Sequence, residues 1–129
     1  MESDVLVVDD SAAIRKILQR VLRQTGMQIR SIHEAGDGQE ALAVLKAQSV
    51  NLVLSDINMP KMDGIQLLGA IKGSPEWRAI PVVMITTEGG ETKVAEAVRL
   101  GAAGYVRKPF TADQIKEKLA GILETALPL

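Results

Sequence analysis

Short, continuously apolar runs alternate along this chain with segments in which apolar residues recur at every third or fourth position. The runs at 5–8, 52–54 and 81–85 are typical of parallel strands that are buried on both faces. After the first run, Ile14, Ile17 and Leu18 begin the apolar face of a helix, with Arg15 on its polar side. The pattern predicts strands near 4–8, 28–34, 51–55, 80–85 and 103–106, and helices near 11–25, 38–48, 64–73, 91–100 and 112–126.

This alternation amounts to five strand–helix units. It predicts an α/β fold, a doubly wound parallel sheet with right-handed crossovers and helices on both faces. The chain has 129 residues and shows no linker, repeat or low-complexity tract. We therefore expect a single domain over 1–129, with its core between about 4 and 125.

Composition narrows the functional classes. The chain has 15 Lys and Arg residues against 16 Asp and Glu residues, so it lacks the global basic field that attracts nucleic acids or anionic membranes. It has no cysteine and one histidine, His33, which excludes disulfides, thiol chemistry and zinc or copper sites. No apolar run reaches the ~20 residues of a membrane span, and the N-terminus does not resemble a signal peptide. We expect a cytoplasmic protein without direct nucleic-acid binding or membrane insertion.

Polar residues follow the predicted strands at the point where each strand ends. Asp9 and Asp10 follow the first strand, Asp56 the third, Thr86 the fourth and Lys108 the fifth. In a doubly wound fold these ends open on one edge, where ligands bind. If the strand order is 2-1-3-4-5, the first and third strands are neighbours at roughly 4.8 Å, which brings the three carboxylates together. Such carboxylates repel one another unless a cation neutralises them, and Mg²⁺ fits because it prefers carboxylate, water and phosphate oxygens.

Asp56 is the carboxylate best placed to react, because it stands as a single carboxylate at the end of its strand, where the loop at 57–64 begins. Attack of a carboxylate on phosphorus gives an acyl phosphate. Phosphoryl transfer requires mainly alignment and stabilisation of the charge on three oxygens. Mg²⁺ and Lys108 would stabilise this charge and the Thr86 hydroxyl would add a hydrogen bond. The predicted catalytic set is Asp56, Lys108 and Thr86.

Four separated motifs then give the chain a family resemblance. The segments VLVVDD at 5–10, LSDINMPKMDG at 54–64, VVMITTE at 82–88 and GAAGYVRKPF at 101–110 resemble the receiver domain of two-component response regulators. The resemblance is greatest to single-domain chemotaxis regulators of the CheY type, and it extends from Val5 to about Leu123. It implies a flavodoxin-like, three-layer (βα)5 sandwich with the sheet order 2-1-3-4-5.

The resemblance also implies a role for each residue of the site. Asp56 matches the phospho-acceptor, which a histidine kinase phosphorylates in a Mg²⁺-dependent step. Asp10 matches a direct Mg²⁺ ligand, Asp9 a residue that acts largely through water, and Asn58 a ligand through its backbone carbonyl. Lys108 matches the lysine that pairs with the phosphoryl group, and its bond to the following proline is expected to be cis.

Two further matches imply how phosphorylation would be passed on to a partner protein. Thr86 matches a switch hydroxyl that moves toward the phosphoryl group, and Tyr105 matches the aromatic residue that then turns inward. This change would reshape the face built by the fourth helix, fifth strand and fifth helix, which would bind a protein partner in chemotaxis or flagellar control. The candidate contacts on this face are Lys93, Tyr105 and Lys118.

Three residues are expected to tune removal of the phosphoryl group. Asn58 and Glu88 occupy positions that, in such receivers, help to set how quickly water removes the phosphate. Thr87 stands where many chemotaxis-type sequences have a smaller residue, so it is expected to crowd access to the phosphoryl group. We predict spontaneous dephosphorylation, and no enzymatic activity beyond the chain's own phosphorylation and dephosphorylation at Asp56.

Other functions stay open at this point. A haloacid-dehalogenase-type phosphatase also uses a nucleophilic Asp with Mg²⁺, but it needs a second Asp where this chain has Asn58. A nucleotide or flavin binder would need a phosphate-binding loop where this chain places carboxylates. A constitutive adaptor would not require the intact set of acidic and basic residues. Within the family, the alternatives are a phosphorelay shuttle and a receiver excised from a larger regulator or hybrid kinase.

Overall fold

The computed structural model describes residues 3–86 and 91–126. Each predicted strand and helix is present, with bounds within two residues of those predicted. The strands are β1 Ser3–Val8, β2 Ile29–Ala35, β3 Leu52–Asp56, β4 Val82–Thr86 and β5 Gly104–Arg107. The helices are α1 Ala12–Gln24, α2 Gly38–Ala47, α3 Gly64–Lys72, α4 Glu91–Leu100 and α5 Ala112–Ala126.

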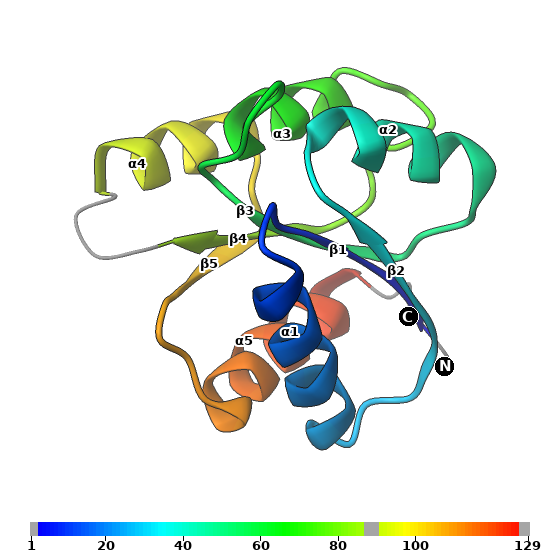
Figure 1. Cartoon of the computed structure of the whole chain (residues 1–129), viewed down its shortest axis with the longest axis vertical. Coiled ribbons are helices and arrows are strands. Elements are labelled where there is room, and N and C mark those ends of the chain that lie inside the picture. The colour runs from blue at the N-terminus through cyan, green and yellow to red at the C-terminus, as the bar shows by residue number, and fades with distance from the viewer. Residues whose placement is uncertain (1–2, 87–90, 127–129) are drawn as a thin grey trace.

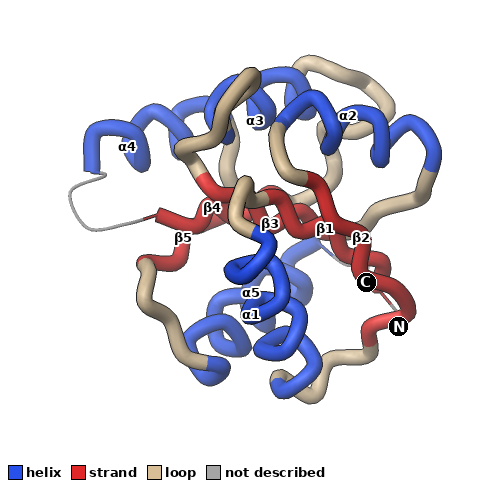
Figure 2. The backbone as a smooth tube through the Cα atoms, in the orientation of Figure 1, coloured by secondary structure: helices blue, strands red, loops and turns tan. Residues whose placement is uncertain are grey.

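The strands form one parallel sheet in the order β2-β1-β3-β4-β5, as predicted. Helices α1 and α5 cover one face of this sheet, and α2, α3 and α4 cover the other (Figure 1). The strands therefore lie in the middle layer of a three-layer sandwich, as Figure 2 shows by secondary structure. In the part of the chain that the structure describes, no helix is long and apolar enough to cross a membrane.

The apolar residues of the strands pack into two cores, one on each face of the sheet. Successive strand side chains point to opposite faces, so Leu6 and Val8 join one core while Val5 and Val7 join the other. This explains the continuous apolar runs, because both faces of β1, β3 and β4 are covered. The largest fully buried side chains include Leu18, Leu22, Leu67, Leu68, Ile71, Met84 and Ile115.

One residue of the predicted apolar face of α1 does not face the core. Ile17 is 43% exposed, whereas its neighbour Leu18 is fully buried. Helix α1 packs on the sheet through Leu18, Val21 and Leu22. Ile17 precedes Leu18 by one residue, about 100° around the helix, and this rotation places it at the margin of the contact.

Two helix caps fix the loops that follow β1 and β3. Ser11 begins α1, and its hydroxyl accepts a hydrogen bond from Ile14 N at 3.3 Å. Asp63 begins α3 in a capping box, in which Asp63 accepts from Gln66 N at 2.9 Å and Gln66 accepts from Asp63 N at 3.0 Å. Each cap satisfies donors that a helix end leaves unpaired. Both helices consequently start at fixed points beside the edge where the strands end.

The loop between β3 and α3 is also held by backbone contacts. Gly64 N donates to Ile57 O at 2.8 Å, which closes the loop on itself. Met62 O accepts from Gly38 N at 3.0 Å, which ties the loop to the start of α2. A Cβ atom at Gly64 would lie 2.1 Å from the backbone oxygen of Asp56. The close approach of α3 to the end of β3 therefore requires glycine at this position.

Candidate functional site

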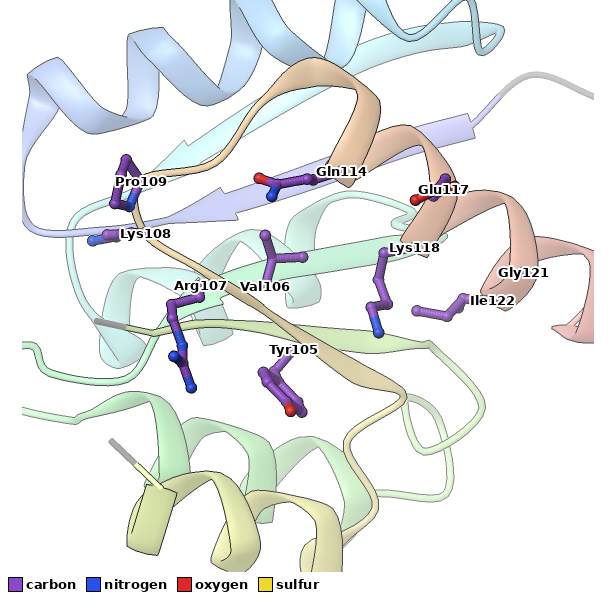
Figure 3. A pocket seen from close by; sticks show the side chains of 10 residues that line it. All are labelled: Tyr105, Val106, Arg107, Lys108, Pro109, Gln114, Glu117, Lys118, Gly121 and Ile122. Atoms are coloured by element: carbon purple, nitrogen blue, oxygen red, sulfur yellow. The ribbon is translucent and has the colours of Figure 1, made fainter. Parts of the chain in front are cut away.

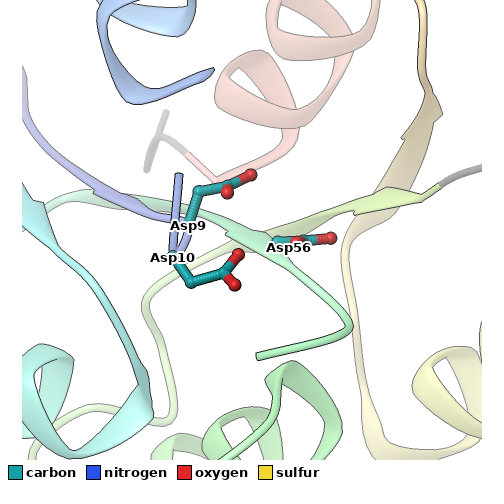
Figure 4. Close-up of side chains that lie close together, drawn as sticks. All are labelled: Asp9, Asp10 and Asp56. Atoms are coloured by element: carbon teal, nitrogen blue, oxygen red, sulfur yellow. The ribbon is translucent and has the colours of Figure 1, made fainter. Parts of the chain in front are cut away.

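Three carboxylates meet at the edge where β1 and β3 end. Val8 pairs with Ser55 in the parallel register, so the residues that follow each of them lie side by side. Asp9, Asp10 and Asp56 each offer one carboxylate oxygen, and these oxygens all lie within 4.8 Å of one another. Figure 4 shows the three side chains directed to the same side of the sheet edge. The prediction that strand order brings these residues together is confirmed.

Every polar group of Asp9 is engaged by the protein. Its backbone N–H donates to Ala35 O at 3.1 Å, and its backbone oxygen accepts from Arg15 Nη1 at 2.5 Å. Its carboxylate accepts from Ser11 N at 2.9 Å through Oδ1 and from Lys108 Nζ at 3.1 Å through Oδ2. Asp9 is also almost fully buried. These contacts leave Asp9 less available than Asp10 for direct binding of a cation.

Asp10 and Asp56 differ in exposure. Asp10 is exposed, and within the described ranges no hydrogen bond to its carboxylate is seen. Asp56 is buried, and its Oδ1 accepts from Ile57 N at 2.8 Å. Burial raises the pKa of Asp56, while the Lys108 ammonium lowers it and the Asp9 carboxylate raises it further. A carboxylate that is costly to ionise in this setting gains from any additional positive charge beside it.

Lys108 reaches this edge from the loop after β5. Its backbone N–H donates to Thr86 O at 2.6 Å, which anchors the loop to the end of β4. The Lys108–Pro109 bond is cis, as expected. The side chain is 18% exposed, and Nζ lies 3.1 Å from Asp9 Oδ2 and 3.6 Å from Asp56 Oδ1. The ammonium group thus lies against two of the three carboxylates.

The residues at this edge fit a hard divalent cation. Mg²⁺ binds oxygen at about 2.0–2.1 Å, so two ligands on opposite sides of the ion are about 4.2 Å apart. The spread of the carboxylate oxygens, at most 4.8 Å, is close to this value, and rotation of the exposed Asp10 side chain can close the difference. The exposed side of the cluster leaves room for the water molecules that Mg²⁺ keeps. Oxygen donors without nitrogen or sulfur favour a hard ion such as Mg²⁺ over zinc or copper.

The predicted switch residues lie on neighbouring strands. Met84 pairs with Tyr105 in the register of β4 and β5, and Thr86 is two residues beyond Met84. Because strand side chains alternate, Thr86 and Tyr105 belong to the same face of the sheet. Thr86 is buried, whereas Tyr105 is 42% exposed. The structure thus holds Tyr105 in an outward position.

Comparison with known proteins decides the family. The response regulator receiver domain family matches residues 5–120. The chain belongs to this family. It is 42% identical to chemotaxis protein CheY-3 of Vibrio cholerae serotype O1 over 93% of this chain and 91% of that protein. It is 39% identical to chemotaxis protein CheY of Pseudomonas aeruginosa over 93% of this chain and 95% of that protein.

Solved structures agree with this assignment. The receiver domain of NtrX from Brucella abortus superposes with a TM-score of 0.83 at 35% identity, covering 95% of this chain and 99% of that one. The chain is therefore a receiver domain of the CheY type, a class of signalling module that is generally not enzymatic. The predicted family and fold are both confirmed.

Of the three predicted tuning residues, the described ranges include Asn58. Thr87 and Glu88 lie outside the described residues. Asn58 is described, and it is exposed in the loop two residues after Asp56. Its backbone N–H helps to lower the pKa of Asp56 against the effect of burial. Asn58 is thus near enough to Asp56 to influence its carboxylate.

Arg15 is a residue of the site that the sequence pattern did not indicate. The helical pattern places it on the polar side of α1, where an arginine is ordinarily solvated. In the structure its side chain is only 19% exposed and contacts both Asp9 and Glu34. The available signal was its place in the first turn after the acidic pair, but helical periodicity alone does not distinguish a buried polar contact from a solvated one.

Proposed function

We propose that Asp56 of this receiver domain accepts a phosphoryl group from a histidine kinase in a Mg²⁺-dependent step. The observation that carries this proposal is the convergence of Asp9, Asp10, Asp56 and Lys108 at one sheet edge. The phosphorus–nitrogen bond of a phosphohistidine would break as an oxygen of Asp56 bonds to phosphorus. The products would be an acyl phosphate on Asp56 and a histidine whose leaving nitrogen takes up one proton from solvent, so that its ring ends neutral. The family membership of the chain supports this chemistry.

The residues of the site have separate tasks in this proposal. Asp10 and Asp56 would hold Mg²⁺ through their carboxylates, Asn58 through its backbone carbonyl, and Asp9 largely through water. When bound, Mg²⁺ would supply positive charge to the phosphoryl oxygens. Lys108, now shared between Asp9 and Asp56, would pair with the phosphoryl group once Asp56 carries it. The catalytic group is thus Asp56 with Lys108 and Thr86.

Phosphorylation would be read on the face made by α4, β5 and α5. The Thr86 hydroxyl would move toward the phosphoryl group, and the space it leaves would admit Tyr105, which lies on the same face of the sheet. Tyr105 now contacts Lys118, whose Nζ lies 5.6 Å from the ring centroid, a cation–π distance. Both line a cleft of about 780 Å³ between β5 and α5 (Figure 3). Inward rotation of Tyr105 would therefore reshape this cleft.

A protein partner would bind this altered face. Lys93 on α4 and Lys118 on α5 are both exposed, and Lys118 contacts the exposed Tyr105, so these three residues are the contacts we propose. The similarity to two chemotaxis CheY proteins favours a partner in chemotaxis or flagellar control. Asn58, Thr87 and Glu88 would set how quickly water removes the phosphate. We further propose that residues 1–129 act as a single receiver unit.

The test is phosphorylation by a small donor. The protein is incubated with acetyl phosphate and Mg²⁺, and intact mass is compared for the wild type, Asp56→Asn, and the control Asp113→Asn, which removes an exposed carboxylate on α5. We expect one added phosphoryl group in the wild type and the control, none in Asp56→Asn, and none when Mg²⁺ is chelated. Equal labelling of Asp56→Asn would show that another residue is the acceptor.

A further inference from the structure

Arg15 joins three elements beside the acidic cluster. Its Nε donates to Glu34 Oε1 at 2.9 Å, and its Nη1 donates to the backbone oxygen of Asp9 at 2.5 Å. Arg15 lies in the first turn of α1, Glu34 near the end of β2, and Asp9 directly after β1. With only 19% of its side chain exposed, Arg15 is held between two partners. Its position is therefore fixed on both sides.

The backbone oxygen of Asp9 belongs to the peptide that links Asp9 to Asp10. A peptide unit is planar, so a hydrogen bond to its oxygen fixes the orientation of the whole unit. That orientation sets the direction in which the Cα–Cβ bond of Asp10 leaves the chain. Since no hydrogen bond to the Asp10 carboxylate is seen within the described residues, the backbone determines the point and direction from which this side chain extends, and rotation about its own bonds covers only the remaining short distance. Arg15 thus acts on Asp10 through the peptide between them.

We propose that Arg15, held by Glu34, is a positioning residue that aims the Asp10 carboxylate at the divalent-cation site beside Asp56. The inference rests on the proposed function, because it assumes that Asp10 binds the ion. Arg15 itself touches neither the ion nor the phosphoryl group. Its hydrogen bond to a backbone oxygen leaves the carboxylate oxygens of Asp9 to Ser11 and Lys108.

The chemistry of the two contacts explains why the residue is arginine. A guanidinium group presents its N–H donors in a rigid fork, so one side chain can bond two acceptors in fixed directions. Lysine at this position would offer one compact ammonium group and could not hold Glu34 and the Asp9 oxygen in the same geometry. The Glu34 carboxylate also offsets the charge of Arg15, which limits repulsion between the guanidinium group and an incoming cation.

Magnesium affinity tests this role. The dissociation constant of Mg²⁺ is measured by titration calorimetry for the wild type, Arg15→Met, Arg15→Lys, Glu34→Gln and the control Arg20→Met, which removes an exposed arginine of the same helix. Loss of a partner that orients a metal ligand typically weakens binding 10- to 100-fold. We expect about a tenfold weaker affinity for Arg15→Met, a similar loss for Arg15→Lys, a smaller loss for Glu34→Gln, and no change for Arg20→Met.

A second measurement separates positioning from general stability. Labelling of Asp56 by acetyl phosphate is followed at increasing Mg²⁺ concentration, at a temperature where each variant is folded. We expect Arg15→Met to need more Mg²⁺ for half-maximal labelling but to reach a rate close to wild type at saturation. A purely structural role would lower the unfolding midpoint and leave the Mg²⁺ requirement unchanged, which would overturn the inference.

The outcomes also separate this inference from the proposed function. If the wild type neither binds Mg²⁺ nor becomes labelled at Asp56, the proposed function fails and this inference fails with it. If the wild type does both and Arg15→Met matches Arg20→Met in Mg²⁺ affinity, the inference alone is wrong. Should Arg15→Met not fold, Arg15→Lys and Glu34→Gln decide the question, because wild-type affinity in both would contradict the role.

Discussion

The ammonium group of Lys108 lies closer to Asp9 than to Asp56, with Nζ 3.1 Å from Asp9 Oδ2 and 3.6 Å from Asp56 Oδ1. Asp9 is held by further contacts to Ser11 and Arg15, so its position does not depend on Lys108 alone. Lys108 therefore lies between a carboxylate that the protein holds in place and the carboxylate that we propose to be the phosphoryl acceptor. It needs to shift only slightly to contact a group carried by Asp56.

This geometry predicts the effect of removing the positive charge of Lys108. In Lys108→Met we expect labelling of Asp56 by acetyl phosphate to be slower by about tenfold or more, because a hydrogen bond to a charged group contributes roughly 1.5–3 kcal/mol. Rates are compared by intact mass at saturating Mg²⁺, with Lys116→Met as the control for loss of an exposed lysine. Equal rates in the two variants would contradict a role for Lys108 in transfer.

Replacing each of two glycines of α3 by alanine should change the stability of the protein in opposite directions. Gly64→Ala places Cβ 2.1 Å from the Asp56 backbone oxygen and 2.9 Å from Ile57 Cα, so the loop or the helix must move. Gly69→Ala meets nothing within 4 Å. We expect urea unfolding to show a loss of about 1–3 kcal/mol for Gly64→Ala and a gain of about 0.5–1 kcal/mol for Gly69→Ala. If the Gly64→Ala protein were as stable as wild type, the approach of α3 to the end of β3 would not be as close as described.

The hydrogen bonds of Asp4, at the start of β1, predict that the stability of the protein depends on pH. Hydrogen bonds from Arg30 Nε at 3.0 Å and Ser31 Oγ at 2.6 Å lower the pKa of Asp4 to about 2, although burial opposes them. In the unfolded chain this carboxyl titrates near 3.8. Because the pKa of Asp4 is lower in the folded state, its ionised carboxylate stabilises the folded protein at pH values above the unfolded pKa. This stabilisation is lost as the pH falls through the folded pKa.

The measurement is the unfolding free energy of wild type and Asp4→Asn between pH 2 and pH 7. We expect the variant to be less stable at neutral pH and the difference to shrink between about pH 4 and pH 2, where unfolding of the wild type takes up close to one additional proton. Asp113→Asn serves as a matched exposed control. A difference that stays constant with pH would mean that Asp4 does not titrate as described.

The fold and most of the site could be predicted from the sequence because they depend on local patterns. Buried parallel strands produce continuous apolar runs, and Asp9 and Asp56 come at the ends of two such runs, whereas Lys108 follows the shorter and more exposed strand β5. The ends of parallel strands share one edge of the sheet, so residues at these positions meet whatever the details of packing. The strand order itself came from family resemblance, since periodicity does not determine which strands are neighbours.

The contacts of Arg15 and Tyr105 could not be predicted in the same way. Arg15 bonds Glu34, which is 19 residues away, through a side chain with several rotatable bonds. Helical periodicity predicts the face on which such a residue lies, but not whether its end is buried by a neighbouring strand. The contact of Tyr105 with Lys118 likewise joins two elements that are separate in the sequence, β5 and α5. Such features are set by tertiary packing.

The outward position of Tyr105 predicts a signal that phosphorylation should change. The chain has one tyrosine and one tryptophan, Tyr105 and Trp77, so fluorinated analogues of each give single ¹⁹F resonances. On addition of acetyl phosphate and Mg²⁺, we expect the Tyr105 resonance to shift in the wild type as its ring turns inward. The Trp77 resonance should stay in place, because Trp77 lies between α3 and β4, at the opposite edge of the sheet from Asp56.

The Thr86→Ala variant tests whether the Thr86 hydroxyl couples phosphorylation of Asp56 to movement of the Tyr105 ring. This variant keeps Asp56, so intact mass should still show one phosphoryl group, while the shift of the Tyr105 resonance should be reduced or absent. Thr92→Ala, which removes an exposed hydroxyl on α4, is the matched control and should behave as wild type. A full Tyr105 shift in labelled Thr86→Ala would mean that the ring responds to the phosphoryl group by a route that bypasses Thr86.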